Sequence, residues 1–292
     1  MEGKLVVLTG ATSGLGRATA LALGKLGAGL ILVSRNIGKG NALAQQIARF
    51  GTGASAWFVQ TDLASQKSVR SAADEIRQRF NCVDILINNG GARFDSYRKT
   101  EDGVERTFAT NHLGHFALTG LLLDRLAVAP TPRVVTVSSR AAAQAIYDGE
   151  WQSLPPDFDC RQAYAKAKLA NLLFASALAQ RTKNSRIISV AYDPGIVASR
   201  FGLNNGFIPW LKHLLYHGAR RELRWPATAA DGLVHLAVTD QLASTASGAC
   251  FRERQEVRTC AASLPPSAAK DLWSLSVTLT GIDPGSSPPN SI

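Results

Sequence analysis

A glycine-rich turn directly after the first apolar run constrains the fold more than any other feature of this chain. The run Leu5-Val6-Val7-Leu8 is typical of a buried strand, and it leads into Thr9-Gly10-Ala11-Thr12-Ser13-Gly14-Leu15-Gly16. A stretch rich in Ala and Leu follows, to about Leu26, and it predicts a helix. Glycines at such a point let the chain turn, bring backbone N–H groups close to an anion and pack the helix near the sheet. The pattern predicts that a dinucleotide diphosphate binds at the helix N-terminus.

The rest of the chain alternates strand-like apolar runs with helical stretches. Short apolar runs without polar alternation suit parallel strands that are covered on both faces. The strands are expected at residues 5–8, 30–33, 56–60, 85–87, 133–137 and 187–191, and the helices at 16–26, 39–50, 67–79, 104–126 and 164–181. This order predicts an α/β fold: a doubly wound, Rossmann-type, mostly parallel sheet with helices on both faces. No linker interrupts the chain between about residues 5 and 260, so residues 1–280 are expected to form a single domain, with residues 281–292 as a disordered tail.

Composition and charge exclude several classes of protein. The 292 residues are 46% hydrophobic and 18% charged, which is enough apolar material for a sizeable core. No apolar run approaches the roughly 18 residues of a membrane span, and the N-terminal residues show no secretory signal. The four cysteines lack zinc-binding spacing, so reduced thiols, no metal and a cytoplasmic location are expected. The net charge of +10 favours anionic partners, but no nucleic-acid-binding motif is present and nucleic acid is not expected.

The spacing T-G-x-x-x-G-x-G resembles the short-chain dehydrogenase/reductase family, and further ordered motifs extend the resemblance from about Leu5 to Phe251. The resemblance implies a nicotinamide dinucleotide as cofactor. Asp62-Leu63 is similar to the family's adenine-contacting pair, and Asn88-Asn89-Gly90-Gly91 to its Asn-Asn-Ala-Gly motif, with Gly90 in place of alanine. In these segments the expected cofactor contacts are Gly10, Thr12, Ser13, Gly14, Leu15, Gly16, Asp62, Leu63, Asn89, Gly90 and Gly91.

A later segment, Asp193-Pro194-Gly195-Ile196-Val197-Ala198-Ser199, is similar to the family's Pro-Gly segment beside the nicotinamide. The family commonly has threonine where Ser199 stands, so the hydroxyl is retained. The resemblance implies that this segment contacts the cofactor through Pro194, Gly195, Val197 and Ser199.

The choice between NAD and NADP is expected to depend on the end of the second strand. Ser34 stands where NAD-preferring members of the family place an acid, and Arg35 follows it. A carboxylate there would repel a 2′-phosphate, whereas a guanidinium pairs with one. Arg17 adds positive charge nearby. The sequence therefore favours NADP(H), with Ser34 and Arg35 at the adenosine ribose. The alternative is that Arg35 is an ordinary solvated arginine.

The residues expected to carry the chemistry lie in the middle of the chain, between residues 111 and 168. Tyr164 and Lys168 are four apart in a helical stretch, so both project from one face. A free phenol has a pKa of about 10, and a neighbouring ammonium is expected to lower it toward neutrality. The resemblance to the family assigns Ser139 to the substrate oxygen, and Asn111 to positioning Lys168 through a water molecule. His112 and His115 are interpreted as packing or surface residues rather than catalytic ones.

Two segments, Asn111–Phe116 and Lys168–Phe174, and the gap from Ser139 to Tyr164 resemble the retinol dehydrogenase and protochlorophyllide oxidoreductase branch of the family. Residues 200–225, apolar first and basic at their far end, are expected to form a lid over a lipophilic carbonyl substrate, a class that includes polycyclic compounds. Two alternatives remain open for this segment: an amphipathic helix that touches a membrane surface, and one that packs on its own domain.

Taken together, the motifs predict an NADP(H)-dependent carbonyl reductase or alcohol dehydrogenase with Tyr164 as general acid/base. The alternatives are a non-catalytic NADP-sensing protein and an epimerase or dehydratase that uses the same four residues. Members of the family often pair through their two long helices, here 104–126 and 164–181, so the chain is expected to be a homodimer or a monomer.

Overall fold

The computed structural model describes residues 1–156, 158–199, 218, 222–239, 242 and 246–285. Most of the expected lid (200–217 and 219–221) and the end of the expected tail (286–292) lie outside the described residues.

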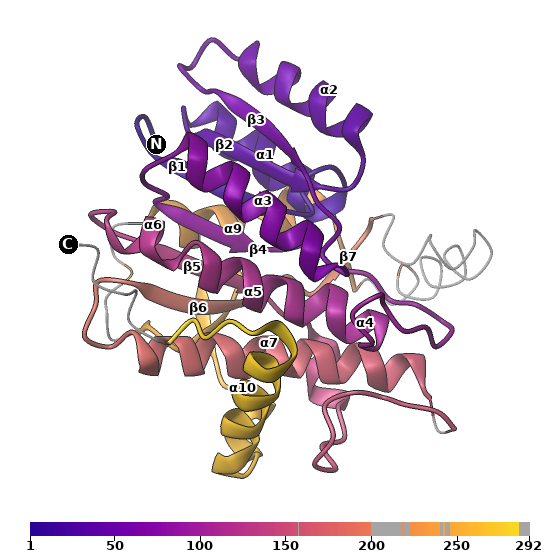
Figure 1. Cartoon of the computed structure of the whole chain (residues 1–292). Coiled ribbons are helices and arrows are strands. Elements are labelled where there is room, and N and C mark those ends of the chain that lie inside the picture. Colours follow the sequence, from indigo (N-terminus) through magenta and orange to yellow (C-terminus); the bar gives the residue numbers. More distant parts are fainter. Residues whose placement is uncertain (157, 200–217, 219–221, 240–241, 243–245, 286–292) are drawn as a thin grey trace.

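One large sheet organises the chain, and its strand order confirms the predicted doubly wound architecture (Figure 1). The order is β10-β9-β6-β5-β4-β1-β2-β3, and every neighbouring pair is parallel except the β9–β10 hairpin at one edge. Such an order reverses its direction between β1 and β4, where the carboxyl ends of the strands leave a crevice for a ligand. The strands are β1 Leu5–Thr9, β2 Gly29–Ser34, β3 Ala56–Gln60, β4 Ile85–Asn88, β5 Arg133–Val137, β6 Ile188–Asp193, β9 Cys250–Arg252 and β10 Gln255–Val257. A separate pair, β7 Ile196–Val197 and β8 Leu223–Arg224, is parallel.

Helices cover both faces of the sheet. The α-helices are α1 Gly14–Lys25, α2 Ile37–Ala48, α3 Gln66–Arg79, α4 Arg106–Phe108, α5 Gly114–Leu121, α6 Leu123–Ala127, α7 Cys160–Arg181, α9 Pro226–Val238 and α10 Pro266–Thr280. Successive strand residues supply the two cores: Val6 and Leu8 pack with α1, α2 and α9, whereas Val7 packs with α3, α5, α6 and α7. Because the central strands β1, β2, β4 and β5 are buried on both faces, their residues are mostly apolar without alternation.

The single helix expected at 104–126 is broken in the structure. A π-helical turn, Ala109–Leu113, separates α4 from α5, and Leu122 separates α5 from α6. The Asn111 side chain donates to the backbone carbonyl of Thr107 at 2.8 Å, four residues earlier. Turns of this kind insert one extra residue and occur frequently at functional sites. A hydrophobic periodicity does not reveal such an insertion, so the sequence predicted a continuous helix.

The first residues of the expected tail, 281–285, belong to the described part of the chain. Gly281 ends α10 in a left-handed conformation (φ 65°). The Trp273 indole N–H then donates to Asp283 Oδ1 at 3.0 Å, and Ile282 and Pro284 lie against Gly120 of α5. Residues 281–285 are therefore packed on the domain. In Figure 1, α10 crosses the outer side of α7.

None of the helices in the described ranges is long and apolar enough to cross a membrane.

Candidate active site

The N-terminus of α1 opens onto a cleft, and the glycine turn lines it. Gly10 (φ 64°) and Gly14 (φ 49°) adopt left-handed backbone conformations. A Cβ on Gly16 would lie 2.3 Å from the Gly10 carbonyl oxygen, so only glycine fits there. The Ser13 side chain makes no capping hydrogen bond, which leaves the first N–H groups of α1 facing the cleft. These features fit the diphosphate of a dinucleotide, which needs a close backbone approach and the positive end of a helix.

A network of hydrogen bonds joins the glycine turn to the end of β4. The Thr9 hydroxyl accepts from the backbone N–H groups of Asn89 and Gly90, at 2.8 and 2.9 Å. In return, the Asn89 side-chain amide donates to the Thr9 carbonyl at 2.8 Å. Asn89, Gly90 and Gly91 thereby line the cleft beside the turn, as expected. A Cβ on Gly90 would meet only the tip of Leu63, at 2.6 Å, and backbone or hydroxyl atoms beyond 3.2 Å.

The residues expected at the adenosine ribose occupy different positions relative to the cleft. Arg35 is exposed and lines it. Ser34 and Thr12 do not line it; the Ser34 hydroxyl donates to Thr12 Oγ1 at 3.2 Å, which ties the end of β2 to the glycine turn. Arg17 points elsewhere, since its guanidinium donates to Gln46 at 2.9 Å.

Asp62 and Leu63 also lie outside the lining of the cleft. The Asp62 carboxylate accepts from the backbone N–H of Ala64 at 3.0 Å, and Ser68 Oγ accepts from the Asp62 backbone N–H at 2.9 Å. Leu63 packs beneath Gly90. In this structure the two residues shape the loop after β3 and support the glycines of the cleft.

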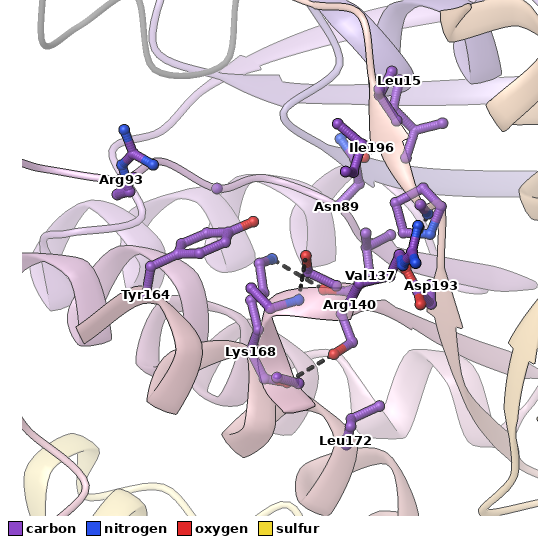
Figure 2. Close-up of a pocket in the computed structure, with 18 of the residues that line it drawn as sticks. Leu15, Asn89, Arg93, Val137, Arg140, Tyr164, Lys168, Leu172, Asp193 and Ile196 are labelled. Carbon is purple, nitrogen blue, oxygen red and sulfur yellow. Dashed lines mark hydrogen bonds between the residues drawn. The ribbon is translucent and has the colours of Figure 1, made fainter. Parts of the chain in front are cut away.

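The end of β5 and one face of α7 bring the expected catalytic side chains together (Figure 2). Ser138 Oγ donates to the Lys168 backbone carbonyl at 2.8 Å, and the Asn171 amide donates to the Val137 carbonyl at 3.0 Å. These hydrogen bonds hold the end of β5 against α7. The Lys168 ammonium donates to the same Val137 carbonyl at 3.1 Å, and Tyr164 is hydrogen-bonded to Ser139. Ser139, Tyr164 and Lys168 all line the cleft.

Burial shifts the pKa values of the tyrosine and the lysine in opposite directions. It raises the pKa of Tyr164 to about 12, against the hydrogen bond from Ser139 and the positive charge of Arg93. It lowers the pKa of Lys168 to about 8. The expectation that Lys168 lowers the tyrosine pKa toward neutrality is wrong for this structure, because desolvation of the phenolate outweighs the attraction of nearby charge. The Lys168 Nζ lies 5.8 Å from the centroid of the Tyr164 ring.

Asn111 is fully buried behind the cleft rather than exposed in it. Its amide oxygen accepts from the Ala92 N–H at 3.2 Å, and its amide nitrogen donates to the Ala92 carbonyl at 2.7 Å. The π-helical turn gives this side chain its place between α4 and the loop after β4. Asn111 therefore fixes the backbone of that loop on both sides of Ala92.

His112 and His115 are packing residues, as interpreted from the sequence. Burial lowers the pKa of His112 to about 4 and that of His115 to about 3. His115 Nε2 is hydrogen-bonded to the Thr9 hydroxyl at 2.9 Å, and His112 Nε2 to Ser276 Oγ of α10 at 2.9 Å. The neutral His115 imidazole connects α5 to β1, and the neutral His112 imidazole connects the π-helical turn to α10.

An ion pair holds the Pro-Gly segment that follows β6. The Asp193 carboxylate accepts from the Arg252 guanidinium at 2.7 and 3.1 Å, and from the Gly195 N–H at 2.9 Å. Ser199 lies against the glycine turn, since a Cβ on Gly14 would be 2.9 Å from the Ser199 Cβ. Pro194, Gly195, Val197 and Ser199 line the cleft, as expected.

The cleft, with a volume of about 1420 Å³, has walls that the sequence reasoning missed. One wall comes from the C-terminal part of the chain, where no motif marks the residues: Cys250, Arg252, Val257, Arg258, Thr259 and Cys260. Two further lining residues are Arg93, which stands two residues after Gly91, and Arg140, which directly follows Ser139. Their closeness in sequence to these two motifs was the signal that could have pointed to them.

Comparisons with known proteins agree with this arrangement. A sequence model of the family described as short chain dehydrogenase matches residues 4–205. Retinol dehydrogenase 14 of Mus musculus is 34% identical over 293 residues, which cover 97% of this chain and 87% of that protein. The crystal structure of an uncharacterised protein from Mycobacterium paratuberculosis has a TM-score of 0.74 and is 32% identical in sequence. The alignment covers 97% of this chain and 95% of that protein chain. The NADPH-bound carbonyl reductase from chicken fatty liver has the same fold, with a TM-score of 0.67 at 18% identity, covering 89% and 100% of the two chains.

Proposed function

Because the chain belongs to the short-chain dehydrogenase family, and is thus an oxidoreductase of CH–OH and C=O groups, we propose that it uses NADP(H) to interconvert a lipophilic ketone or aldehyde and its alcohol. The observation that carries this proposal is the convergence of Ser139, Tyr164 and Lys168 in the cleft that begins at the N-terminus of α1. When bound, the nicotinamide supplies or accepts the hydride.

Tyr164 is the general acid/base of the proposed reaction. With its pKa raised to about 12, the phenol holds its proton at neutral pH, so it can donate that proton to a carbonyl oxygen during reduction. Its hydrogen bond with Ser139 places the two hydroxyls where one substrate oxygen can contact both. The Ser139 Oγ also accepts from the Ala141 N–H at 3.2 Å, which orients it.

Lys168 contributes positive charge beside the reacting oxygen. With its pKa lowered to about 8, the amine is mostly protonated at pH 7, and its bond to the Val137 carbonyl holds it in place. A fixed ammonium stabilises negative charge that develops on Tyr164 or on the substrate oxygen. The fixed loop between Gly90 and Ala92, held by Asn111, forms the facing wall.

The preference for NADP(H) rests on Arg35. It lines the cleft next to Ser34, a position without a carboxylate that would repel a 2′-phosphate. The fold is also shared with a carbonyl reductase that was solved with NADPH, which supports the same choice.

The decisive experiment is Tyr164→Phe. NADPH consumption against a panel of ketones and aldehydes of graded size should fall at least about 100-fold, the usual contribution of a general acid. NADPH binding, followed by fluorescence, should be nearly unchanged because the ring remains. Tyr147→Phe is the matched control, since Tyr147 does not line the cleft. Turnover retained in Tyr164→Phe would remove the acid/base role.

A further inference from the structure

We propose that Arg252 positions the nicotinamide half of the bound dinucleotide, by holding Asp193 and through it the turn at Pro194-Gly195. Arg252 is a positioning residue in this proposal, because it acts through the backbone of the segment that follows β6. The inference rests on the proposed function, and it gives a part in that function to a residue that no sequence motif marks.

The segment after β6 lines the cleft between the two places that a dinucleotide has to connect. At one end, Ser199 lies against the glycine turn, since a Cβ on Gly14 would be 2.9 Å from the Ser199 Cβ. At the other end lies Asp193; burial is the main cause of the raised pKa of Tyr164, and the negative charge of Asp193 raises it further. Figure 2 shows Asp193 across the cleft from Tyr164. The segment therefore borders the path of a dinucleotide whose diphosphate binds at the glycine turn and whose ring reacts beside Tyr164.

The Asp193 carboxylate sets the shape of the turn that follows it. Its Oδ1 accepts from the backbone N–H of Gly195 at 2.9 Å, a bond to the residue two positions on that is typical of aspartate in turns. Gly195 has a left-handed conformation, with φ 72°. Its Oδ2 accepts from Arg252 Nη2 at 2.7 Å and from Arg252 Nε at 3.1 Å. One carboxylate oxygen thus shapes the turn, while the other is held by the arginine.

The burial of Asp193 makes the arginine necessary. The Asp193 side chain is 7% exposed, whereas that of Arg252 is 44% exposed and lines the cleft. A buried carboxylate is strongly destabilising when its cationic partner is removed. Without the guanidinium we expect the carboxylate to turn toward water and to release the N–H of Gly195. The turn then loses the bond that fixes it.

The β9–β10 hairpin gives Arg252 a fixed base. Arg252 and Asp193 are register partners at the ends of the paired strands β9 and β6. The next hairpin residue, Glu253, forms an ion pair with Arg224 of β8. β8 in turn pairs with β7, which is the Ile196–Val197 part of the same segment. The hairpin therefore holds the segment at two points, directly at Asp193 and through β8.

The test compares NADPH with 2′-phospho-ADP-ribose, a fragment that keeps the adenosine, the 2′-phosphate and the diphosphate but lacks the nicotinamide ring. Titration calorimetry measures the Kd of each ligand. In Arg252→Met we expect the Kd of NADPH to rise about tenfold, the value of one hydrogen bond, and that of the fragment to change by less than about twofold. Arg252→Lys keeps a positive charge beside the carboxylate and should restore most of the NADPH affinity.

Arg254→Met is the matched control on the same hairpin. Arg254 is paired with Asp231 of α9 at 3.0 and 3.1 Å, but it does not line the cleft, so this variant should bind both ligands as the unaltered chain does. A second background tests the route of the effect. With Asp193→Asn already present, Arg252→Met should no longer change the Kd of NADPH, because the carboxylate that the arginine holds is gone.

The outcomes separate the inference from the proposed function. If the unaltered chain binds neither NADPH nor the fragment, the proposed function itself fails. If Arg252→Met weakens both ligands by the same factor, Arg252 supports the fold of the whole cleft and the inference is overturned. Unchanged NADPH binding in Arg252→Met overturns it as well. An equal effect of Arg252→Met with and without Asp193→Asn would reject the route through Asp193.

Discussion

The space for an added Cβ decides which glycines beside the cleft can be replaced by alanine. Gly16 has no room for a Cβ, because the Gly10 carbonyl oxygen would lie 2.3 Å away and the backbone cannot move without opening the turn. Gly90 differs, since its added Cβ would press mainly on the flexible tip of Leu63. Alanine substitutions at Gly16 and Gly90 therefore form a matched pair that tests whether the cleft tolerates an added Cβ.

We expect Gly16→Ala to lower the free energy of unfolding by about 1–3 kcal/mol and to weaken NADPH binding, because overpacking distorts the turn. Gly90→Ala should fold normally and bind NADPH with similar affinity. Urea unfolding and fluorescence titration of both variants measure these effects. Equal behaviour of the two alanine variants would mean that the turn tolerates distortion and that the close approach of Gly16 has no role.

Arg35 provides a second test at the scale of one residue. Arg35→Ala should weaken NADPH binding by about 10- to 100-fold, the value of a charge-assisted hydrogen bond, and should affect NADH much less. Arg17→Ala is the control, because Arg17 is bonded to Gln46 instead of facing the cleft. Fluorescence titrations with both nucleotides give the ratio, and an equal loss for NADPH and NADH would exclude a contact with the 2′-phosphate.

The identities of Tyr164, Lys168 and Ser139 followed from spacing and resemblance, but their electrostatics did not. A four-residue spacing on a helix predicts proximity. It does not report how deeply the pair is buried, and burial is what raises the pKa of Tyr164 and lowers that of Lys168. For the same reason the sequence left Arg93 unnoticed, although it borders a recognised motif.

At the scale of the element, the π-helical turn and the first turn of α5 carry a pH dependence. His112 and His115 stay neutral in the fold, because burial lowers their pKa values to about 4 and about 3 from 6.5. The unfolded chain takes up protons at both as the pH falls below 6.5, whereas the folded chain does so only near pH 4 to 3. Stability is therefore present above pH 6.5 and lost progressively toward acid.

We expect the free energy of unfolding to fall between pH 6.5 and 4.5 by up to about 1.4 kcal/mol per pH unit for each of the two histidines. His115→Gln should be less stable at pH 7.5, because the bond to Thr9 changes, but its stability should depend less steeply on pH. Urea denaturation at several pH values gives both quantities. A variant slope as steep as that of the unaltered chain would show that His115 does not titrate on unfolding.

Apart from the broken helix at 104–126, the strands and helices predicted in the first 193 residues match those of the structure to within a few residues, because a buried apolar run leaves a clear signal. Beyond residue 191 the sequence predicted the cofactor-contacting segment 193–199, the lid and the tail, but no strand. Short β9 and β10 have polar residues such as Arg252 and Gln255, and they are strands only because β9 pairs with β6. Long-range pairing of this kind leaves no local pattern.

At the scale of the whole molecule, α10 and the residues after it pack over α5 and α7. Trp273 of α10 packs edge-on against Phe116 at 5.0 Å and stacks on Phe174 at 6.0 Å. The Arg181 guanidinium lies 4.0 Å from the centre of the Trp273 ring, and Asp283 accepts from its indole N–H. The face of α5 and α7 that a partner would need is thus occupied by α10 and residues 281–285.

Of the two oligomeric states considered, a homodimer and a monomer, we therefore expect the monomer, with a mass of 31.1 kDa. Light scattering coupled to size-exclusion chromatography measures the mass directly, over a range of protein concentrations. A stable dimer would mean either that another surface pairs or that α10 leaves its place on α7. Trp273→Ala separates the two, since loss of the aromatic contacts should alter only a dimer formed through the helices.

The cleft takes its proton chemistry from the middle of the chain and one of its walls from Cys250 to Cys260, far along the sequence. Mutations in that later stretch can change what the cleft admits while the proton-transfer residues remain untouched. Selection can therefore act on the range of substrates and on the reaction separately. A lineage that keeps this fold can acquire new substrates by changes between Cys250 and Cys260 alone. A chimaera that exchanges only this stretch between two related enzymes would take its substrate selectivity from one parent and its catalysis from the other.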